Sequence, residues 1–372
     1  MAHVVPVGSR TLMEGGRLYQ RNRATEVMDE GLYHHLLRTG RFRDPDKQLA
    51  MIRATSTLSR LRPGTMVTVC REMGLGDVLM VCIVIRALKM AHPRLTFRLA
   101  TGRAYLPLLH EAPWLDAVES LMDMRGPVAN VIDLRDVPER HPRRESMDRI
   151  DIFALTCGVA VSDYTIPIAP VTDEQRARVR KMIGPGAYIA LAARGSTHVR
   201  TWPLGHVQAF AKLAAGRGWT VVVLDPGAVE MPAHPGIRNL TGQVSLMDAK
   251  AVIAESDFCV STDSGLQHLA EAVGTRCLAI YSTIPPRLRL GRYQHVRALW
   301  RESLPCVPCH DRGCPAAPCM QVAPEIVLCG IDQWDRLGMS TNVDAPGCTL
   351  SAAPIEVAAE SRIMGAWPLG AA

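Results

Sequence analysis

The 372 residues, 48% of them hydrophobic and 21% charged, exclude a disordered chain and are enough to bury the cores of two domains. The net charge of +6 suits an anionic substrate or an anionic membrane face, whereas 5% aromatic residues and the lack of a binding motif argue against nucleic acid. No apolar run reaches membrane-spanning length and the start lacks a signal-peptide profile, so we expect a cytoplasmic protein whose 11 cysteines are thiols or metal ligands.

Residues 1–62 are rich in arginine and differ from the chain that follows. Apolar residues recur at helical spacing in 28–36 and again in 49–58, and "RPG" (62–64) ends the segment. We therefore predict an N-terminal helical extension over 1–62. Its basic character suits a peripheral contact with the inner face of a membrane or a contact with a neighbouring subunit, and the sequence does not choose between them.

From residue 66 onward, strands and helices alternate. "MVTVC" (66–70), "LTFRLA" (95–100) and "VANVIDL" (128–134) predict strands, and 78–90 and 147–157 predict helices. The Pro-rich stretch before Thr172 is a plausible linker, and Thr172 is the expected N-cap of the next helix. These features predict a first α/β domain over 63–171.

The alternation restarts beyond this linker. "YIALAA" (188–193), "TVVVLD" (220–225), "DFCV" (257–260) and "CLAIYS" (277–282) predict strands, and the helices expected between them cover 206–216, 246–254 and 266–273. Two such arrays predict an α/β fold of two Rossmann-like, doubly wound domains that face each other across a cleft. The second domain would cover 172–337, and 338–372 would be a tail with one short helix near 355–364.

The loop "REMGLGDVLM" (71–80) resembles a dinucleotide fingerprint but breaks it, because Leu79 stands where the third glycine belongs. A Rossmann dehydrogenase is therefore the least favoured class. Asp77 at the start of the helix is either an N-terminal cap or a base that faces the cleft, and the loop alone favours the cap.

Three loops of the second array follow strand ends and carry groups that suit a nucleoside diphosphate. "RGSTHVRTWP" (194–203) offers hydroxyls and Arg200 to phosphate, and "DPGAVE" (225–230) offers an acid to ribose. "STDSGLQH" (261–268) puts Asp-Ser-Gly at a helix N-terminus, where unpaired N–H groups attract anions. The alternatives are a solvated loop for the first and an ordinary helix cap for the last.

Taken together, "GLGDVLMVCIVIRALKMAHP", "RTWP" and "STDSGLQHLAEAVGT" resemble, in order and spacing, glycosyltransferase family 9, the ADP-heptose:lipopolysaccharide heptosyltransferases. The resemblance covers about 66–334. It implies the GT-B fold, inversion at the anomeric carbon and no metal or other cofactor for catalysis. It also implies an ADP-heptose-like donor on the second domain and a glycan, lipid-linked or protein acceptor on the first.

The resemblance also assigns roles to residues. It implies that Asp77 is the general base and that Gly74 and Gly76 form the acceptor loop. The donor would be bound by Ser196, Thr197, Arg200, Glu230, Asp263, Ser264, Gly265 and His268. Arg200 replaces the lysine that is usual in the family, and "STIPP" (282–286) replaces its usual "GPTDP". His268 either lines the diphosphate site or packs in the core.

The loop "CVPCHDRGCPAAPCM" (306–320) has four cysteines in a compact spacing, Cys306, Cys309, Cys314 and Cys319. In a reducing compartment such a set indicates a structural zinc or iron site, with His310 as an alternative ligand, or a set of reduced thiols. The sequence leaves both open.

The leading interpretation is therefore an inverting sugar transferase of lipopolysaccharide or glycan synthesis. The alternatives are a protein O-heptosyltransferase with a metal-binding cysteine loop, a catalytically inactive nucleotide-sugar-binding or interaction protein, and a metal or redox sensor built on that loop. Asp77 argues against the inactive protein, because a pure binding module needs no base.

Overall fold

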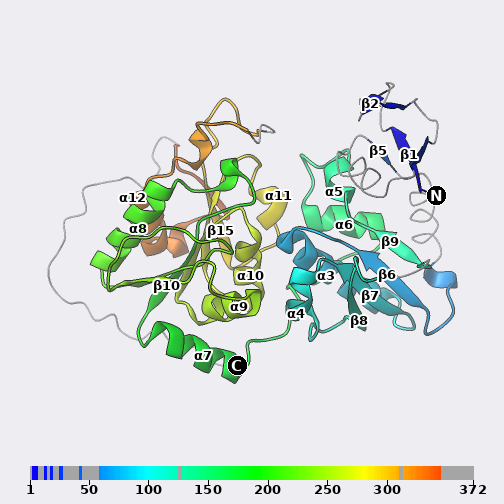
Figure 1. Cartoon of the computed structure of the whole chain (residues 1–372), viewed down its shortest axis with the longest axis horizontal. Helices are drawn as coiled ribbons and strands as arrows, with labels where there is room; N and C mark the ends of the chain where they lie inside the picture. The colour runs from blue at the N-terminus through cyan, green and yellow to red at the C-terminus, as the bar shows by residue number, and fades with distance from the viewer. Residues whose placement is uncertain are drawn as a thin grey trace.

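The computed structural model describes residues 58–124, 128–309 and 313–344, together with five short strands within 1–57. Two lobes, each built on a parallel sheet, lie side by side (Figure 1). Among the described residues, no helix has both the length and the apolar character needed to cross a bilayer.

The described part of the N-terminal extension is made of strands. β1 (Ala2–Pro6) pairs antiparallel with β4 (Thr25–Val27) and β5 (Phe42–Arg43), and β2 (Leu12–Glu14) pairs with β3 (Arg17–Tyr19). The predicted helical extension is wrong for these strands, because helical spacing at 28–36 says nothing about "AHVVP", whose β-branched valines favour a strand. Most positions that carried the helical spacing lie outside the described residues, and Leu58 begins the short turn η1 (Leu58–Arg60).

The first lobe contains a four-stranded parallel sheet in the order β8-β7-β6-β9. The strands are β6 (Met66–Cys70), β7 (Thr96–Thr101), β8 (Ala117–Ser120) and β9 (Val131–Asp133). The helical segments are α3 (Leu75–Ala91), η2 (Arg103–Tyr105), α4 (Leu106–Leu109), α5 (Val137–Arg140) and α6 (Arg149–Cys157). The predicted strands and the two predicted helices are confirmed, and β8, α4 and α5 add to them.

The second lobe contains a seven-stranded parallel sheet in the order β12-β11-β10-β13-β14-β15-β16. The strands are β10 (Tyr188–Ala192), β11 (Thr220–Val223), β12 (Ile237–Asn239), β13 (Phe258–Thr262), β14 (Cys277–Tyr281), β15 (Val296–Trp300) and β16 (Ser340–Asn342). β16 corrects the predicted tail, since residues 340–342 complete the sheet beside β15. The helix expected near 355–364 lies outside the described residues.

Helices cover both faces of this larger sheet. The α-helices are α7 (Asp173–Ile183), α8 (Leu204–Gly216), α9 (Leu246–Glu255), α10 (Gly265–Val273), α11 (Arg287–Leu290) and α12 (Pro324–Asp332). Short turns lie at η3 (His198–Arg200), η4 (Pro318–Met320) and η5 (Trp334–Arg336). Alternate strand residues face two cores, one shared with α8 and α12 and the other with α9 and α10.

The expected start and stop signals of two helices are present. Thr172 and Gln175 form a capping box at the start of α7, which satisfies N–H groups that have no partner within the helix. Gly274 ends α10 in the left-handed conformation, with φ of 78°.

The two lobes meet where α3 packs against α10. The core that the larger sheet shares with α9 and α10 continues through this contact into the first lobe. The contact between the lobes, called the seam below, is therefore apolar. Lys250 of α9 is fully buried and donates to the carbonyl oxygens of Ala169 (3.0 Å) and Pro170 (3.3 Å), which fixes the linker between the lobes.

Each sheet has one point where the strand order reverses, between β6 and β9 in the first lobe and between β10 and β13 in the second. Loops diverge at such a point and leave a crevice at the carboxyl ends of the strands, where ligands of open α/β sheets bind. The predicted site residues are therefore expected at these two crevices.

Candidate functional site

Asp77 lies in the first turn of α3, beside the crevice of the first lobe. Arg149, the first residue of α6, holds it through Nε to Oδ1 at 2.5 Å and through a terminal nitrogen to Oδ2 at 3.0 Å. Arg71, at the end of β6, donates to Oδ2 of the same carboxylate. Asp77 is therefore not the N-terminal cap of α3. That position is held by Gly74, with φ of 83° and no side-chain cap, and the helix begins at Leu75.

The two arginines are themselves fixed by other groups. Arg71 donates to the carbonyl oxygens of Met73 (3.1 Å) and Leu134 (3.2 Å), and both guanidinium groups also pair with Glu139. This arrangement joins β6, α5 and α6 around one carboxylate. Charged hydrogen bonds of this kind are short and directional, so Asp77 has a defined orientation.

The surroundings of Asp77 keep it ionised. Burial alone raises the pKa of this carboxyl group, but the positive charges of Arg149, Arg71 and Arg289 reverse that effect and lower the pKa to about 2. The carboxylate is therefore deprotonated throughout the physiological range, and it is a weak base while both arginines contact it.

In the second lobe, Arg200 joins the loops that follow β10 and β13. Its Nε lies 3.1 Å from Oδ2 of Asp263, and a terminal nitrogen donates to the Asp263 carbonyl oxygen. Another terminal nitrogen donates to Oγ of Ser196 at 3.2 Å. Oγ1 of Thr197 is buried and has no hydrogen-bond partner among the described residues. Ser196, Thr197, Arg200 and Asp263 thus converge, as the sequence predicts.

The N-terminus of α10 offers fewer free N–H groups than the motif suggests. The N–H of Asp263 donates to the carbonyl oxygen of Ile280 within the sheet, at 3.1 Å. Ser264 is the N-cap of α10, and Gly265 begins the helix, where the first N–H groups have no acceptor within the helix. An anion at this position would therefore use the N–H groups that follow Asp263.

His268 is buried rather than open to the crevice. Its Nδ1 lies 2.6 Å from the hydroxyl oxygen of Tyr293, and only 4% of the residue is exposed. Burial lowers the pKa of His268 to about 4, against the opposing effects of Asp263 and Asp77. His268 is thus packed in the core in this arrangement, and its role beside the diphosphate stays a prediction.

Two glycines allow α3 and α10 to approach at the seam. A Cβ atom on Gly76 would lie 2.3 Å from Cδ2 of His268, and one on Gly265 would lie 2.7 Å from Cβ of Leu75. The seam therefore requires glycine at both positions. The Cβ side of Gly265 is filled by Leu75 of the first lobe, so packing alone accounts for the glycine, and its role in donor binding stays a prediction.

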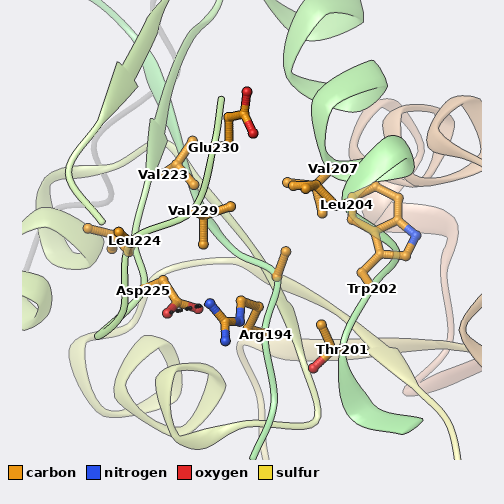
Figure 2. A pocket seen from close by; sticks show the side chains of 12 residues that line it. Arg194, Thr201, Trp202, Leu204, Val207, Val223, Leu224, Asp225, Val229 and Glu230 are labelled. Carbon is orange, nitrogen blue, oxygen red and sulfur yellow. Dashed lines mark ion pairs between the residues drawn. The ribbon is translucent and has the colours of Figure 1, made fainter. Parts of the chain in front are cut away.

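A cavity of about 240 Å³ lies beside the Arg200 loop, at the ends of β10 and β11. Its lining is mostly apolar, with Trp202 and Leu204 on one wall and Val229 on another (Figure 2). Arg194 and Asp225 form an ion pair at 3.5 Å at one end, and Glu230 lies at the other end (Figure 2). The predicted ribose-binding acid, Glu230, thus belongs to the wall of this cavity.

The cysteine loop lies next to the second lobe, and residues 310–312 within it, including His310, are outside the described residues. Cys306, Cys314 and Cys319 carry free thiols. Burial raises the pKa of the Cys319 thiol, and the nearby thiols of Cys306, Cys309 and Cys314 raise it further. In the described part of the chain, no three His, Cys, Asp or Glu side chains are arranged to hold a metal ion.

Glycosyltransferase family 9 (heptosyltransferase) matches residues 140–320, which include the Arg200 loop and the start of α10. Residues 140–320 of the chain are thus similar to this family. The predicted resemblance is confirmed.

Two curated relatives agree with this result. Lipopolysaccharide heptosyltransferase 1 of Pseudomonas aeruginosa is 28% identical over 141 residues, which are 36% of this chain and 39% of the relative. Lipopolysaccharide heptosyltransferase 2 of Escherichia coli is 31% identical over 120 residues, 29% of this chain and 32% of the relative. The alignments therefore span well under half the length of these curated relatives.

Solved structures extend the comparison to both lobes. A family 9 glycosyltransferase from Veillonella parvula superposes with a TM-score of 0.58 at 16% identity, over 73% of this chain and 98% of that one. ADP-heptose lps heptosyltransferase II of E. coli gives 0.57 at 15% identity, over 72% and 97%. The iron-containing heptosyltransferase TibC, in complex with ADP-D-beta-D-heptose, gives 0.57 at 16% identity, over 74% and 77%. The predicted GT-B fold is confirmed.

The structure adds three arginines that the sequence did not mark. Arg71 and Arg149 hold Asp77, and Arg289 of α11 lies close enough to lower its pKa. Two sequence signals lie near them: Arg71 begins the loop "REMGLGDVLM", and the departure from the family pattern at "STIPP" comes just before α11.

Proposed function

We propose that the protein is an inverting glycosyltransferase that moves a heptose-like sugar from a nucleoside diphosphate to an acceptor hydroxyl. The observation that carries this proposal is the meeting of the two crevices. Asp77 follows β6, Arg200 and Asp263 follow β10 and β13, and the helices that begin at these crevices touch at Gly76 and His268. The heptosyltransferase relatives support the same class of reaction.

The donor would bind to the second lobe. The apolar cavity is suited to a nucleoside, with Glu230 near the ribose, and the N-terminus of α10 is suited to the diphosphate. Arg200 would leave Asp263 and contact phosphate oxygens, with Ser196 and Thr197 beside it. The buried and unpartnered Oγ1 of Thr197 supports a polar ligand at this position.

The transfer would use Asp77 as the base. The acceptor oxygen attacks the anomeric carbon as the bond to the diphosphate oxygen breaks, so the bonding electrons leave with the diphosphate. Asp77 takes the hydroxyl proton. Three nearby arginines, two of them in contact, hold the pKa of Asp77 near 2. We propose that the acceptor hydroxyl replaces one of the two contacts, which raises the basicity of the carboxylate in the complex. Gly74 and Gly76 shape the loop around the acceptor.

The acceptor would be a glycan of the lipopolysaccharide type, since the curated relatives are lipopolysaccharide or lipooligosaccharide heptosyltransferases. A protein acceptor is the second candidate within the same chemistry. For a lipid-linked acceptor we also propose a peripheral contact with the inner membrane face, supported by the net charge of +6.

A structural metal at the cysteine loop is a separate proposal, supported by the proximity of the other three thiols to that of Cys319 and by the iron in TibC. The described residues of the loop are not arranged to hold a metal ion, and we assign no step of the transfer to one. Elemental analysis of the protein purified without added metal tests this proposal. We expect about one zinc or iron per chain, and its loss in a Cys306→Ser, Cys309→Ser variant. A metal content near zero would contradict it.

A donor panel tests the proposed function. ADP, GDP, UDP and CDP are titrated into the wild-type protein, and the corresponding sugar nucleotides are then assayed for transfer. We expect one nucleoside diphosphate to bind well above the others, and its sugar to be transferred with inverted anomeric configuration. If none of the four diphosphates binds, the proposed function is wrong.

A further inference from the structure

α11 (Arg287–Leu290) is a single turn that follows β14 and lies against the first lobe. Leu288 and Leu290 are buried and fix the turn to the core. The next residue, Gly291, is so close to α6 that a Cβ atom on it would lie 3.2 Å from Oδ2 of Asp148. α11 therefore carries a residue of the second lobe to the helix whose first residue, Arg149, holds Asp77.

Arg289 is the residue of α11 that differs from the other arginines at the seam. Arg71, Arg149 and Arg200 each form an ion pair with a carboxylate. For Arg289, no such ion pair occurs among the described residues, and its one side-chain hydrogen bond there is a donation to the carbonyl oxygen of Leu288 at 3.1 Å. The residue is partly buried.

The charges around Arg289 come from both lobes. Burial lowers its pKa, the nearby Arg149 lowers it further, and Asp263 and Asp77 act in the opposite direction. α11 follows β14, the neighbour of β13 in the sheet, so Arg289 stands at the same sheet edge as Asp263. α11 also contacts α6, which begins at Arg149 beside Asp77. A partly buried guanidinium that has a like charge nearby and no carboxylate in contact is stabilised by a bound anion.

We propose that Arg289 binds the donor diphosphate together with Arg200. This inference rests on the proposed function, because the diphosphate is the anion that the second crevice would hold. As the sugar–phosphate bond breaks, negative charge grows on the diphosphate, and a guanidinium fixed by a buried turn stabilises that charge without reorganisation. Arg289 would thus take part in both donor binding and transfer.

The test compares Arg289→Gln with Arg287→Gln. Arg287 is an exposed arginine on the same turn and is the matched control. The nucleoside diphosphate that the wild type binds best and its parent nucleoside are titrated into each protein. We expect Arg289→Gln to weaken diphosphate binding about 10- to 100-fold and to leave nucleoside binding unchanged. Arg287→Gln should match the wild type. Arg289→Lys, which keeps a charge but not the two-pronged geometry, should fall between them.

Each outcome has a defined meaning. If the wild type binds a diphosphate and Arg289→Gln binds it equally well, the assignment of Arg289 is wrong and the proposed function stands. A rise in the acceptor KM in that case would show that Arg289 recognises an anion on the acceptor. If the wild type binds no nucleoside diphosphate, both the assignment and the proposed function are wrong. Should Arg289→Gln fail to fold, Arg289→Lys decides between the same outcomes.

Discussion

The two crevices have the same topology and similar residues but hold their charges differently. In the first lobe, the side chains of Arg71 and Arg149 are 6% and 10% exposed, and both contact Asp77. In the second lobe, the side chains of Arg200 and Arg194 are 29% and 49% exposed, and each pairs with one carboxylate. Buried ion pairs are costly to break, whereas exposed ones exchange partners easily. The first crevice is thus built to fix one carboxylate, and the second to exchange its partners for a ligand.

The largest expected effect is that of Asp77→Asn, which removes the proposed base and nearly preserves its shape. We expect transfer to fall about 10²- to 10⁴-fold, the range of general-base catalysis, with the protein still folded. Transfer is measured at saturating donor, and the melting temperature is checked in parallel. Asp116→Asn is the control, because Asp116 is a surface partner of Lys89 in the same lobe. Transfer at the wild-type rate in Asp77→Asn would contradict the proposal that Asp77 is the base.

His268 gives a pH-dependent test of the seam. Its folded-state pKa is about 4 against an ordinary value of 6.5, so the unfolded chain binds more protons between these values. The stability that neutral His268 contributes is therefore full above pH 6.5 and is lost as the pH falls toward 4. The loss is roughly 3 kcal/mol.

Urea unfolding of the wild type and of His268→Gln, at pH 7 and at pH 4.5, measures this effect. We expect the wild type to lose more stability than the variant over this interval. His110→Gln, a change at an exposed histidine, should behave like the wild type. Parallel pH dependence in the wild type and His268→Gln would contradict the burial of His268 at the seam.

Arg200→Ala tests the second crevice, where the arginine is expected to exchange Asp263 for the ligand. The variant loses a charged contact with phosphate, so we expect the Kd for the nucleoside diphosphate to rise about 10- to 100-fold. Calorimetric titration measures it. Arg178→Ala is a suitable control, because Arg178 is an exposed arginine that pairs with Asp248 in the same lobe. Unchanged binding in Arg200→Ala would mean that its pairing with Asp263 is purely structural.

The smallest expected change is that of Gly76→Ala at the seam. The added methyl group would lie 2.3 Å from the His268 ring, so the lobes must separate slightly or the ring must move. We expect a loss of about 1–3 kcal/mol in the free energy of unfolding. Gly205→Ala in α8 is the control, since nothing lies within 4 Å of the new methyl group. Equal stability in both variants would show that the seam is looser than described.

The positions of the loops that follow strand ends could be predicted from the sequence. The contacts between the two lobes could not. "GLGD", "RTWP" and "STDSG" stand out because a strand precedes each loop, and the parallel sheets then bring them to the two crevices. The partners of Asp77 could not be predicted, because Arg149 reaches it only when β9 lies beside β6 and α6 packs on α3. The strands of the extension were missed because one helical pattern was applied to a segment whose valines favour strands.

The roles of Gly76 and Gly265 could not be predicted from the sequence either. Gly76 and Gly265 look in sequence like positions where a ligand approaches the backbone. In the structure the other lobe occupies that space. A glycine needed for packing and a glycine needed for a ligand are indistinguishable in one sequence, because both require only the absence of a side chain.

The most direct measurement is the binding of one nucleoside diphosphate to Asp77→Asn beside the wild type. If the first crevice fixes the base and the second holds the donor, the two proteins should bind the diphosphate with the same Kd, within about a factor of three. Transfer should nevertheless be lost in the variant. A Kd raised as much as in Arg200→Ala would contradict this division of roles and would make Asp77 part of the donor site.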